Sequence, residues 1–189
     1  MKEKCWEIDY LRTLEKEERK QIKCTRVIKD FVLYPAIRFV IYFRNYQKTN
    51  SKVLKFMLRF GLLRLNRKYG LEISPKAQIG KGLKIIHPHC ITISGFAHIG
   101  ENCTLLKGCT IGANSGTAEI WGAPTIGDKV YVGINSTVVG KIKVGDDVLI
   151  APNTLVNRDV PSHSIVIGNP MKIIPRENAT QYYINTDNL

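Results

Sequence analysis

The 189-residue sequence has only five cysteines, and no two of them form a CxxC pair. Their odd number argues against a disulfide framework, and the missing pairs argue against a structural zinc site. The opening segment MKEKCWEIDY has no apolar core of the kind found in a secretory signal. We therefore expect a protein of the reducing cytoplasm.

No apolar run is long enough to span a bilayer. The best candidate, residues 31–43, is interrupted by Arg38 and falls well short of the ~20 residues required. The sequence also lacks a glycine-rich phosphate loop and the interleaved aromatic and basic residues of a nucleic-acid surface. We expect no membrane span and no nucleic-acid partner.

The positive charge lies in the first third of the chain. Residues 1–70 hold 18 Lys and Arg against 7 Asp and Glu, a net of +11, whereas the remainder holds 10 against 9, a net of +1. This asymmetry predicts a boundary near Gly70. We expect a basic amphipathic helical region at 1–70, a second domain at 71–174 and a C-terminal tail at 175–189.

Residues 27–46 and 52–69 carry apolar residues at spacings of three and four, which predicts helices, with a break at Pro35. Their apolar faces pack either on the rest of the protein or on a sister subunit. Alternatively, bases within residues 26–68 contact anionic lipid at the inner face of a membrane. These bases are Arg38, Arg44, Lys48, Lys52, Lys55, Arg59, Arg64, Arg67 and Lys68.

Beyond Gly70, aliphatic residues recur every six positions. They are Ile73, Ile79 and Ile85, then Ile93, Ile99, Leu105 and Ile111, then Ile126, Val132, Val138, Val144, Ile150 and Val156. A period of six predicts a β-solenoid in which three short strands close one triangular coil. The register breaks at residues 85–93 and 111–126, and the second break predicts a loop around GANSGTAEIWGAP.

The repeat also predicts which side chains face outward. With the aliphatic residue as position one, the third position is solvent-facing and includes His87. The fifth position is inward-facing and includes Cys103 and Cys109 as core residues. His89 falls on an inward position, so we expect it to act mainly through packing, although the extra residues after it could turn it outward.

The segments LEISPKAQIGKGLKIIHPHCITI and DVPSHSIVIGNPMKII, with the repeats between them, resemble the hexapeptide-repeat acyltransferases, in their serine acetyltransferase-like branch. The resemblance implies a mostly β fold, a left-handed parallel β-helix, with an α-helical N-terminal region. It also implies a homotrimer in which acetyl-CoA lies between neighbouring subunits.

In that branch a histidine acts as general base, and His87 occupies the matching place. Imidazole suits this role because its ordinary pKa is ~6.5. The family pairs this histidine with an acid fifteen positions earlier, which here is Glu72. A carboxylate in that role fixes the tautomer and stabilises the imidazolium.

Two substrate contacts of serine acetyltransferases are replaced here. An Asp before the catalytic histidine corresponds to Ile86, and a second histidine in the loop corresponds to Ala123. The chain also has about seventy residues in place of the long helical domain. We therefore expect an acetyl-CoA-dependent O-acetyltransferase acting on a sugar or surface-polysaccharide precursor, with serine as the alternative acceptor.

The resemblance places acetyl-CoA as co-substrate, mostly against backbone, and implies no metal. The matching positions are Ala113, Gly133, Ile134, Ala151 and Pro152, with Lys172 near the nucleotide end. Two other classes stay open: a trimeric metalloenzyme with histidines shared between subunits, and a solenoid without catalysis. His87, His89, His98 and His163 are poorly spaced to converge on one metal.

Overall fold

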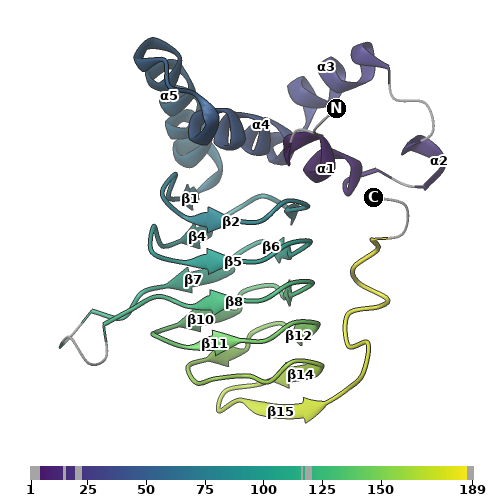
Figure 1. Cartoon of the computed structure of the whole chain (residues 1–189), viewed down its shortest axis with the longest axis vertical. Helices are drawn as coiled ribbons and strands as arrows, with labels where there is room; N and C mark the ends of the chain where they lie inside the picture. The colour runs from purple at the N-terminus through teal and green to yellow at the C-terminus, as the bar shows by residue number, and fades with distance from the viewer. Residues whose placement is uncertain (1–4, 15, 20–22, 116, 118–120, 187–189) are drawn as a thin grey trace.

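The computed structural model describes residues 5–14, 16–19, 23–115, 117 and 121–186. A stack of β coils forms the body of the molecule, and helices cover one end of it (Figure 1). The helices are α1 (Cys5–Leu11), α2 (Lys16–Arg19), α3 (Cys24–Leu33), α4 (Pro35–Lys48) and α5 (Lys52–Tyr69). None of these described helices is both long enough and apolar enough to cross a membrane.

Three parallel sheets form the sides of the solenoid. Sheet A contains β1 (Leu71–Ile73), β4 (Ile91–Ile93), β7 (Thr110–Gly112), β10 (Thr137–Val139) and β13 (Leu155–Val156). Sheet B contains β2 (Gln78–Ile79), β5 (His98–Ile99), β8 (Thr125–Ile126) and β11 (Lys143–Val144). Sheet C contains β3 (Lys84–Ile86), β6 (Thr104–Leu106), β9 (Tyr131–Val132), β12 (Val148–Ile150), β14 (Ser164–Ile167) and an antiparallel last strand, β15 (Lys172–Pro175).

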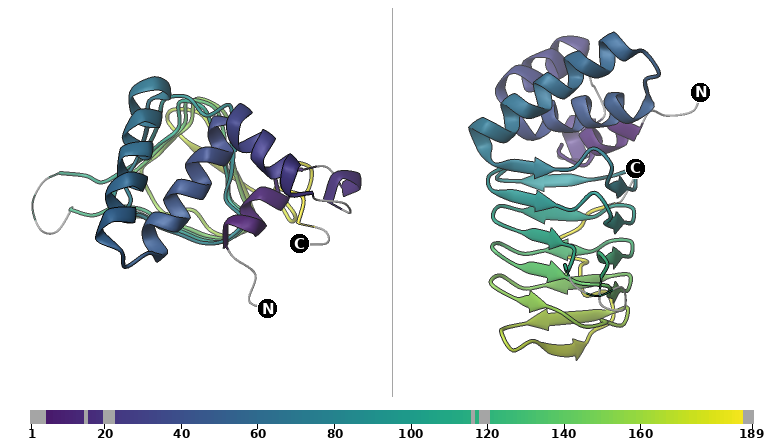
Figure 2. Two further views of the ribbon diagram at one scale, coloured as in Figure 1. Left: turned by 90° about the horizontal axis from the view of Figure 1, so that it is seen from above. Right: turned by 90° about the vertical axis from the view of Figure 1, so that its left-hand side faces the viewer.

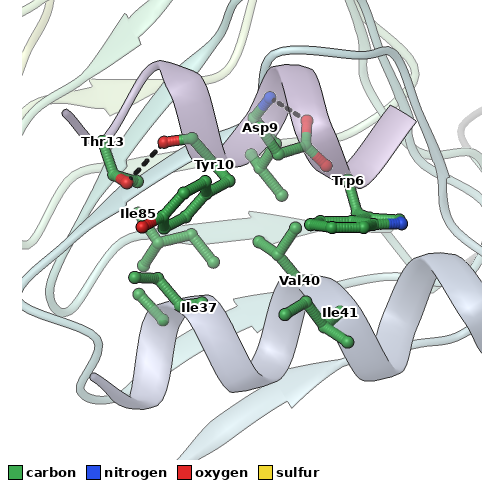
Figure 3. Close-up of a pocket in the computed structure, with 10 residues that line it drawn as sticks. Trp6, Asp9, Tyr10, Thr13, Ile37, Val40, Ile41 and Ile85 are labelled. Atoms are coloured by element: carbon green, nitrogen blue, oxygen red, sulfur yellow. Dashed lines mark hydrogen bonds between the residues drawn. The ribbon is translucent and has the colours of Figure 1, made fainter. Parts of the chain in front are cut away.

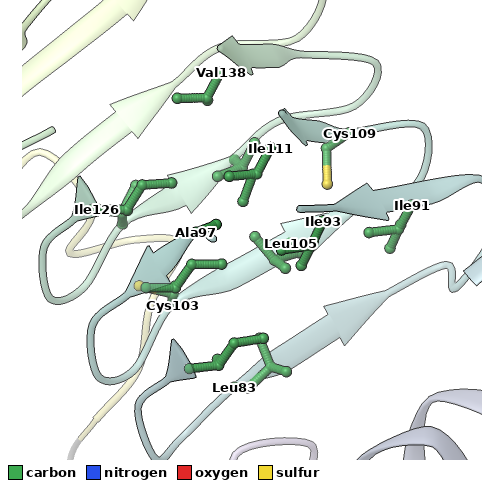
Figure 4. Packing of buried hydrophobic residues seen from close by; sticks show 14 of the residues in the cluster. Leu83, Ile91, Ile93, Ala97, Cys103, Leu105, Cys109, Ile111, Ile126 and Val138 are labelled. Atoms are coloured by element: carbon green, nitrogen blue, oxygen red, sulfur yellow. The ribbon is translucent and has the colours of Figure 1, made fainter. Parts of the chain in front are cut away.

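The six-residue repeat produces the core as predicted. Every repeat aliphatic from Ile73 to Val156 is buried, and so are the fifth-position residues Cys103 and Cys109. Figure 4 shows part of this core, in which Ile93, Cys103, Leu105 and Cys109 point into the interior of the coils. Burying one aliphatic side chain of this size contributes roughly 1.5–3 kcal/mol, so the stacked column supplies much of the driving force for folding.

The predicted loop leaves the solenoid after β7 and rejoins it before β8. Asn114 and Gly122 form an antiparallel bridge at its base, and the described residues next to this bridge project from the side of the stack (Figures 1 and 2). Insertions in a solenoid are displaced outward in this way because the coils above and below leave no room inside.

The two predicted helices begin and end at residues that suit those positions. Pro35 is the first residue of α4, where its missing N–H costs no hydrogen bond, so it separates α3 from α4 as expected. Ser51 caps α5 by accepting a hydrogen bond from the Leu54 N–H, and Gly70 ends it in the left-handed conformation at φ 66°. β1 follows immediately.

The helices close the open end of the first coil. Arg44 on α4 forms a salt bridge of 2.8 Å with Asp9 on α1 and donates hydrogen bonds to the carbonyl oxygens of Ile79 and Gly80. Arg12 donates to the carbonyl oxygens of Gly82 and Cys103. The carbonyl oxygens of Ile79, Gly80 and Gly82 lie at the open edge of the first coil, and these arginines supply their hydrogen-bond donors.

The prediction that Arg44 faces lipid is therefore wrong. The residue is buried, with 8 % of its surface exposed, because its partners on α1 and the first coil draw it inward. Figure 3 shows the apolar part of the same contact, where Trp6 and Tyr10 of α1 face Ile37 and Val40 of α4.

The C-terminal segment runs back along the solenoid toward the helices (Figure 1). Asp147 anchors it by accepting hydrogen bonds from the backbone N–H groups of Ala179 and Thr180 and from the Thr180 hydroxyl. The ring of Tyr183 contacts that of Tyr131 on β9, with centroids 4.9 Å apart. Residues 179–183 of the tail are thus held against sheet C.

Candidate active site at the corner that carries His87

His87 lies at the corner between sheets C and A, directly after β3. Its backbone has a left-handed φ of 53°, and its side chain is exposed, as the repeat predicts. A non-glycine residue in this conformation is uncommon and turns the chain sharply. The turn holds the imidazole on the outer surface of the first coil.

His89 is also exposed, so the prediction that it packs inward is wrong. Eight residues rather than six separate Ile85 from Ile93, and both His87 and Cys90 have left-handed backbones. The corner is therefore wider than an ordinary one and carries His89 outward. Its ring meets the edge of Tyr69 at the end of α5, with centroids 5.4 Å apart.

A groove of about 470 Å³ opens beside His87. One wall is formed by Asp30, Tyr34 and Pro35 at the junction of α3 and α4. The opposite wall is the end of β3 with Lys84, Ile86 and His87. The helical region thus contributes half of a cleft whose other half is the histidine corner.

Charged groups at the α3 wall are already paired. Asp30 accepts a hydrogen bond of 2.7 Å from the Tyr10 hydroxyl and lies 3.5 Å from the Arg26 guanidinium. Burial and this hydrogen bond raise the pKa of Tyr10 to about 12. On the opposite wall, burial lowers the pKa of Lys84, and the nearby charges of Arg12 and Arg19 act in the same direction.

Strand pairing places several predicted residues along one edge of the solenoid. β3 pairs with β6, β6 with β9 and β9 with β12, so the corner after each strand lies beside the corner of the next coil. We call this edge the corner column. It contains His87, Lys107, Gly133, Ile134, Ala151 and Pro152.

The corner column has little room for larger side chains at one position. A Cβ atom added to Gly133 would lie 2.7 Å from the Ile150 carbonyl oxygen and from the Pro152 nitrogen. Lys172 lies near the foot of the column, because it pairs with Ile167 after the last coil. The column therefore joins the histidine corner to an exposed lysine.

Two predicted residues lie away from this column. Glu72 is exposed on β1 and borders a different groove with Arg59 and Asn66 of α5, and no hydrogen bond joins it to His87 in the described part of the chain. Ala113 begins the loop at the other end of sheet A. Neither residue belongs to the corner column of a single chain.

The geometry can be compared with known proteins. Residues 123–158 match the family model described as bacterial transferase hexapeptide (six repeats). Serine acetyltransferase of Helicobacter pylori is 36% identical over 149 residues, which cover 77% of this chain and 85% of that protein. The chain belongs to the hexapeptide-repeat transferases, in their serine acetyltransferase-like branch.

Other relatives agree on the fold of this hexapeptide-repeat transferase. Serine acetyltransferase 4 of Arabidopsis thaliana is 41% identical over 129 residues, and the match covers 67% of this chain but 35% of the plant protein. The solved serine acetyltransferase of Neisseria gonorrhoeae in complex with serine is 27% identical with a TM-score of 0.72, covering 90% of this chain and 68% of that one. The fold is a left-handed parallel β-helix.

The two positions that the resemblance matches to substrate contacts of serine acetyltransferases are apolar here. Ile86 is half-buried beside His87, and Ala123 packs partly buried against the solenoid core. Among the described residues no three His, Cys, Asp or Glu side chains are placed to hold a metal ion. His98 lies on sheet B, and His163 contacts Asp147 on a different corner from His87.

Sequence reasoning missed most of the groove wall. Asp30, Tyr34 and Pro35 come to His87 through the packing of α3 and α4 on the first coil, and no local motif marks that contact. Lys107, in the same corner column, occupies a third position of the repeat, after Leu105, which predicts only that it faces solvent. Its place beside His87 could have been predicted from the sequence spacing. Lys107 follows His87 by twenty residues, and paired residues of β3 and β6 are also twenty residues apart.

Proposed function

We propose that this transferase moves the acetyl group of acetyl-CoA to an acceptor hydroxyl, with His87 as the general base. The observation that carries the proposal is the position of His87. Its exposed side chain belongs to the corner column, which suits the donor, and also lines the groove of the α3–α4 junction, which suits an acceptor.

The chemistry requires one group that first takes and then returns a proton. A neutral imidazole of His87 accepts the proton of the acceptor hydroxyl while that oxygen bonds to the thioester carbonyl carbon. The imidazolium then donates the proton to the sulfur as the carbon–sulfur bond breaks. The products are the O-acetyl ester and the free thiol of CoA, so atoms and charge balance.

Acetyl-CoA fits the corner column for a physical reason. Its pantetheine arm is narrow and carries amides, which need close approach to backbone rather than long side chains. None of Gly133, Ile134, Ala151 and Pro152 carries a long or charged side chain, and Lys172 supplies a cation for the phosphate end. Each of these five residues stays a proposed contact.

A homotrimer completes the proposed site. Ala113 and the loop after it lie at a different corner from His87, so a second copy of the chain is needed to bring them to the corner column.

Glu72 is the proposed acid partner of His87. Replacing it by Gln should lower turnover less than loss of His87, since Gln keeps the shape but not the charge.

Serine is the first acceptor that we propose. All three relatives named above are serine acetyltransferases, and they support serine better than the sugar acceptor expected from the sequence. A sugar hydroxyl is the second candidate. The observation that favours it is the pair Ile86 and Ala123, which offer neither charge nor hydrogen bonds to the ammonium and carboxylate of serine.

The acceptor is tested by incubating the protein with acetyl-CoA and serine, simple sugars or lipid-linked sugars and measuring CoA by chromatography. Serine should release CoA at a rate that saturates with serine concentration. An Ile86→Asp variant should lower the KM for serine if the apolar contact limits binding. Sugar-dependent release with no serine-dependent release would replace serine by the second candidate.

A further inference from the structure

A second groove, of about 380 Å³, lies between α4 and α5 on the helical end of the molecule. We call it the basic groove. Its lining includes the bases Arg38, Arg64, Arg67 and Lys68 together with Tyr42 and Tyr69. No Asp or Glu lines it.

The four bases have no acidic partner within the described part of the chain. Its salt bridges involve other residues, such as Arg44 with Asp9. The Arg38 Nε atom is buried and has no hydrogen-bond acceptor. A buried guanidinium N–H without an acceptor is costly, so its environment is suited to an anion that the chain itself does not supply.

The sequence around the basic groove also lacks acidic residues. Residues 31–71 contain nine Lys and Arg but no Asp or Glu. Arg44 pairs with Asp9 of α1, but neither α4 nor α5 carries a carboxylate that could neutralise the four bases of the basic groove. An anion from another molecule would supply the missing charge. Oxygen atoms of phosphate suit such a cluster, because guanidinium groups bind them with paired hydrogen bonds.

An apolar surface adjoins the basic groove on the same helix. Val53, Phe56 and Phe60 of α5 are 72, 76 and 55 % exposed. Phe60 and Arg67 are seven residues apart, which is two helical turns, so they project from the same side of α5. That side is therefore apolar in its first half and basic in its second half.

We propose that this end of the molecule binds a membrane surface, with the phosphate group of an anionic phospholipid in the basic groove. A bilayer interface offers both features together: phosphate oxygens for the bases and acyl chains for Phe56 and Phe60. α5 lies at the end of the solenoid opposite β15, which leaves the coils directed away from the lipid (Figures 1 and 2).

The lipid site adjoins the proposed active site. Tyr69 lines the basic groove, with the Lys68 ammonium 5.3 Å from its ring centre, and its ring edge contacts His89. His89 is two residues from His87. Binding at the membrane would therefore place the histidine corner close to the lipid surface.

Vesicle flotation tests the proposal independently of catalysis. The full chain should float with vesicles of phosphatidylglycerol and phosphatidylcholine in equal amounts and stay behind with phosphatidylcholine alone. Each base near an anionic surface contributes about fivefold in binding, so Arg64→Gln/Arg67→Gln should weaken binding about 30-fold. The matched control Lys76→Gln/Lys143→Gln, which removes two exposed bases from the solenoid, should bind like the native protein.

A second variant tests the apolar half. Phe56→Ser/Phe60→Ser should also weaken flotation while leaving the circular dichroism and thermal unfolding unchanged, because both rings are exposed. Equal binding to vesicles with and without phosphatidylglycerol would overturn the role of the basic groove.

Two further outcomes would assign the surface to another occupant. Stabilisation by inorganic pyrophosphate that depends on Arg64 and Arg67, with no flotation, would mean that the groove takes a soluble phosphate. A smaller sedimentation coefficient for Phe56→Ser/Phe60→Ser, again with no flotation, would mean that a second copy covers α5. Either result would overturn the membrane proposal.

Discussion

The carboxylate of Asp9 on α1 and the guanidinium of Arg44 on α4 form a buried salt bridge of 2.8 Å above the first coil. The Asp9 side chain has no solvent exposure and also accepts a hydrogen bond of 2.7 Å from the Leu83 N–H. Burial raises the pKa of Asp9, against the opposing effect of Arg44. Two helices and the solenoid therefore meet at one ion pair.

Replacing Asp9 by Asn should destabilise the protein strongly. The variant leaves the Arg44 charge buried without its partner, which typically costs 3–5 kcal/mol in the free energy of unfolding. Urea unfolding measures the effect. The control is Glu101→Gln, which removes an exposed pair with Lys81 at 3.6 Å and should cost less than ~1 kcal/mol. Equal small losses in both variants would contradict the role of the buried pair.

The C-terminal tail should be held most firmly at mildly acidic pH. The hydrogen bond to Asp147 and the charge of Glu177 raise the pKa of His163, so its contribution is complete below ~6.5 and is lost as the pH rises through the raised value. Burial opposes ionisation of Asp147, but hydrogen bonds from Thr180 and His163 lower its pKa overall. That contribution is complete above ~3.9 and is lost in stronger acid.

Hydrogen exchange at Ala179 and Thr180 measures this dependence. After correction for the intrinsic rate, protection should be lower at pH 8 than at pH 6. His163→Gln should remove the difference, whereas His98→Ala, on sheet B, should leave it. Protection that is constant over this range in the native protein would rule out the His163 contribution.

Three of the five thiols should react in the native protein. Cys5, Cys24 and Cys90 are exposed, whereas burial raises the pKa of both Cys103 and Cys109 to about 12. The thiolate is the reactive form of cysteine. A chromogenic aromatic disulfide should therefore label three thiols in native buffer and five in denaturant. Rapid labelling of all five in native buffer would show that the solenoid core is open.

Because His89 is exposed at its wide corner, its side chain should contribute little to the free energy of unfolding. His89→Ala should change the free energy of unfolding by less than ~1.5 kcal/mol, because the exposed ring loses only its edge contact with Tyr69. Cys109→Ser should be more damaging, since it places a hydroxyl in the closed core. A larger loss for His89→Ala than for Cys109→Ser would mean that His89 is packed inward in solution.

The solenoid could be predicted from sequence because its period is strict. A six-residue repeat fixes which side chains point inward, so the burial of Leu105 and Cys103 and the exposure of His87 all follow from one count. The orientation of His89 could not be predicted, because the two extra residues between Ile85 and Ile93 allow its side chain to face either the core or the solvent. Both His87 and Cys90 have left-handed backbones in this corner, and no sequence rule required that conformation at Cys90.

Contacts between distant segments were beyond the reach of sequence patterns. Arg44 has the spacing of an exposed base on an amphipathic helix, and it is structural because of partners at least thirty-five residues away, Asp9 and the carbonyl oxygens of Ile79 and Gly80. The resemblance predicted most residues of the corner column, but only the strand pairing in the structure shows that they lie along one edge. Ala113 stays apart from the column in one chain, so its predicted role depends on assembly.

The proposed role of His87 is tested most directly by the rate of CoA release by His87→Ala, compared with the native protein at saturating acetyl-CoA and the best acceptor. We predict a loss of ~10²- to 10⁴-fold in turnover, the usual scale for a general base, with acetyl-CoA binding by calorimetry unchanged. His98→Ala, which removes an exposed histidine on sheet B, should keep the native rate. Near-native turnover in His87→Ala would contradict the assignment of His87 as the base.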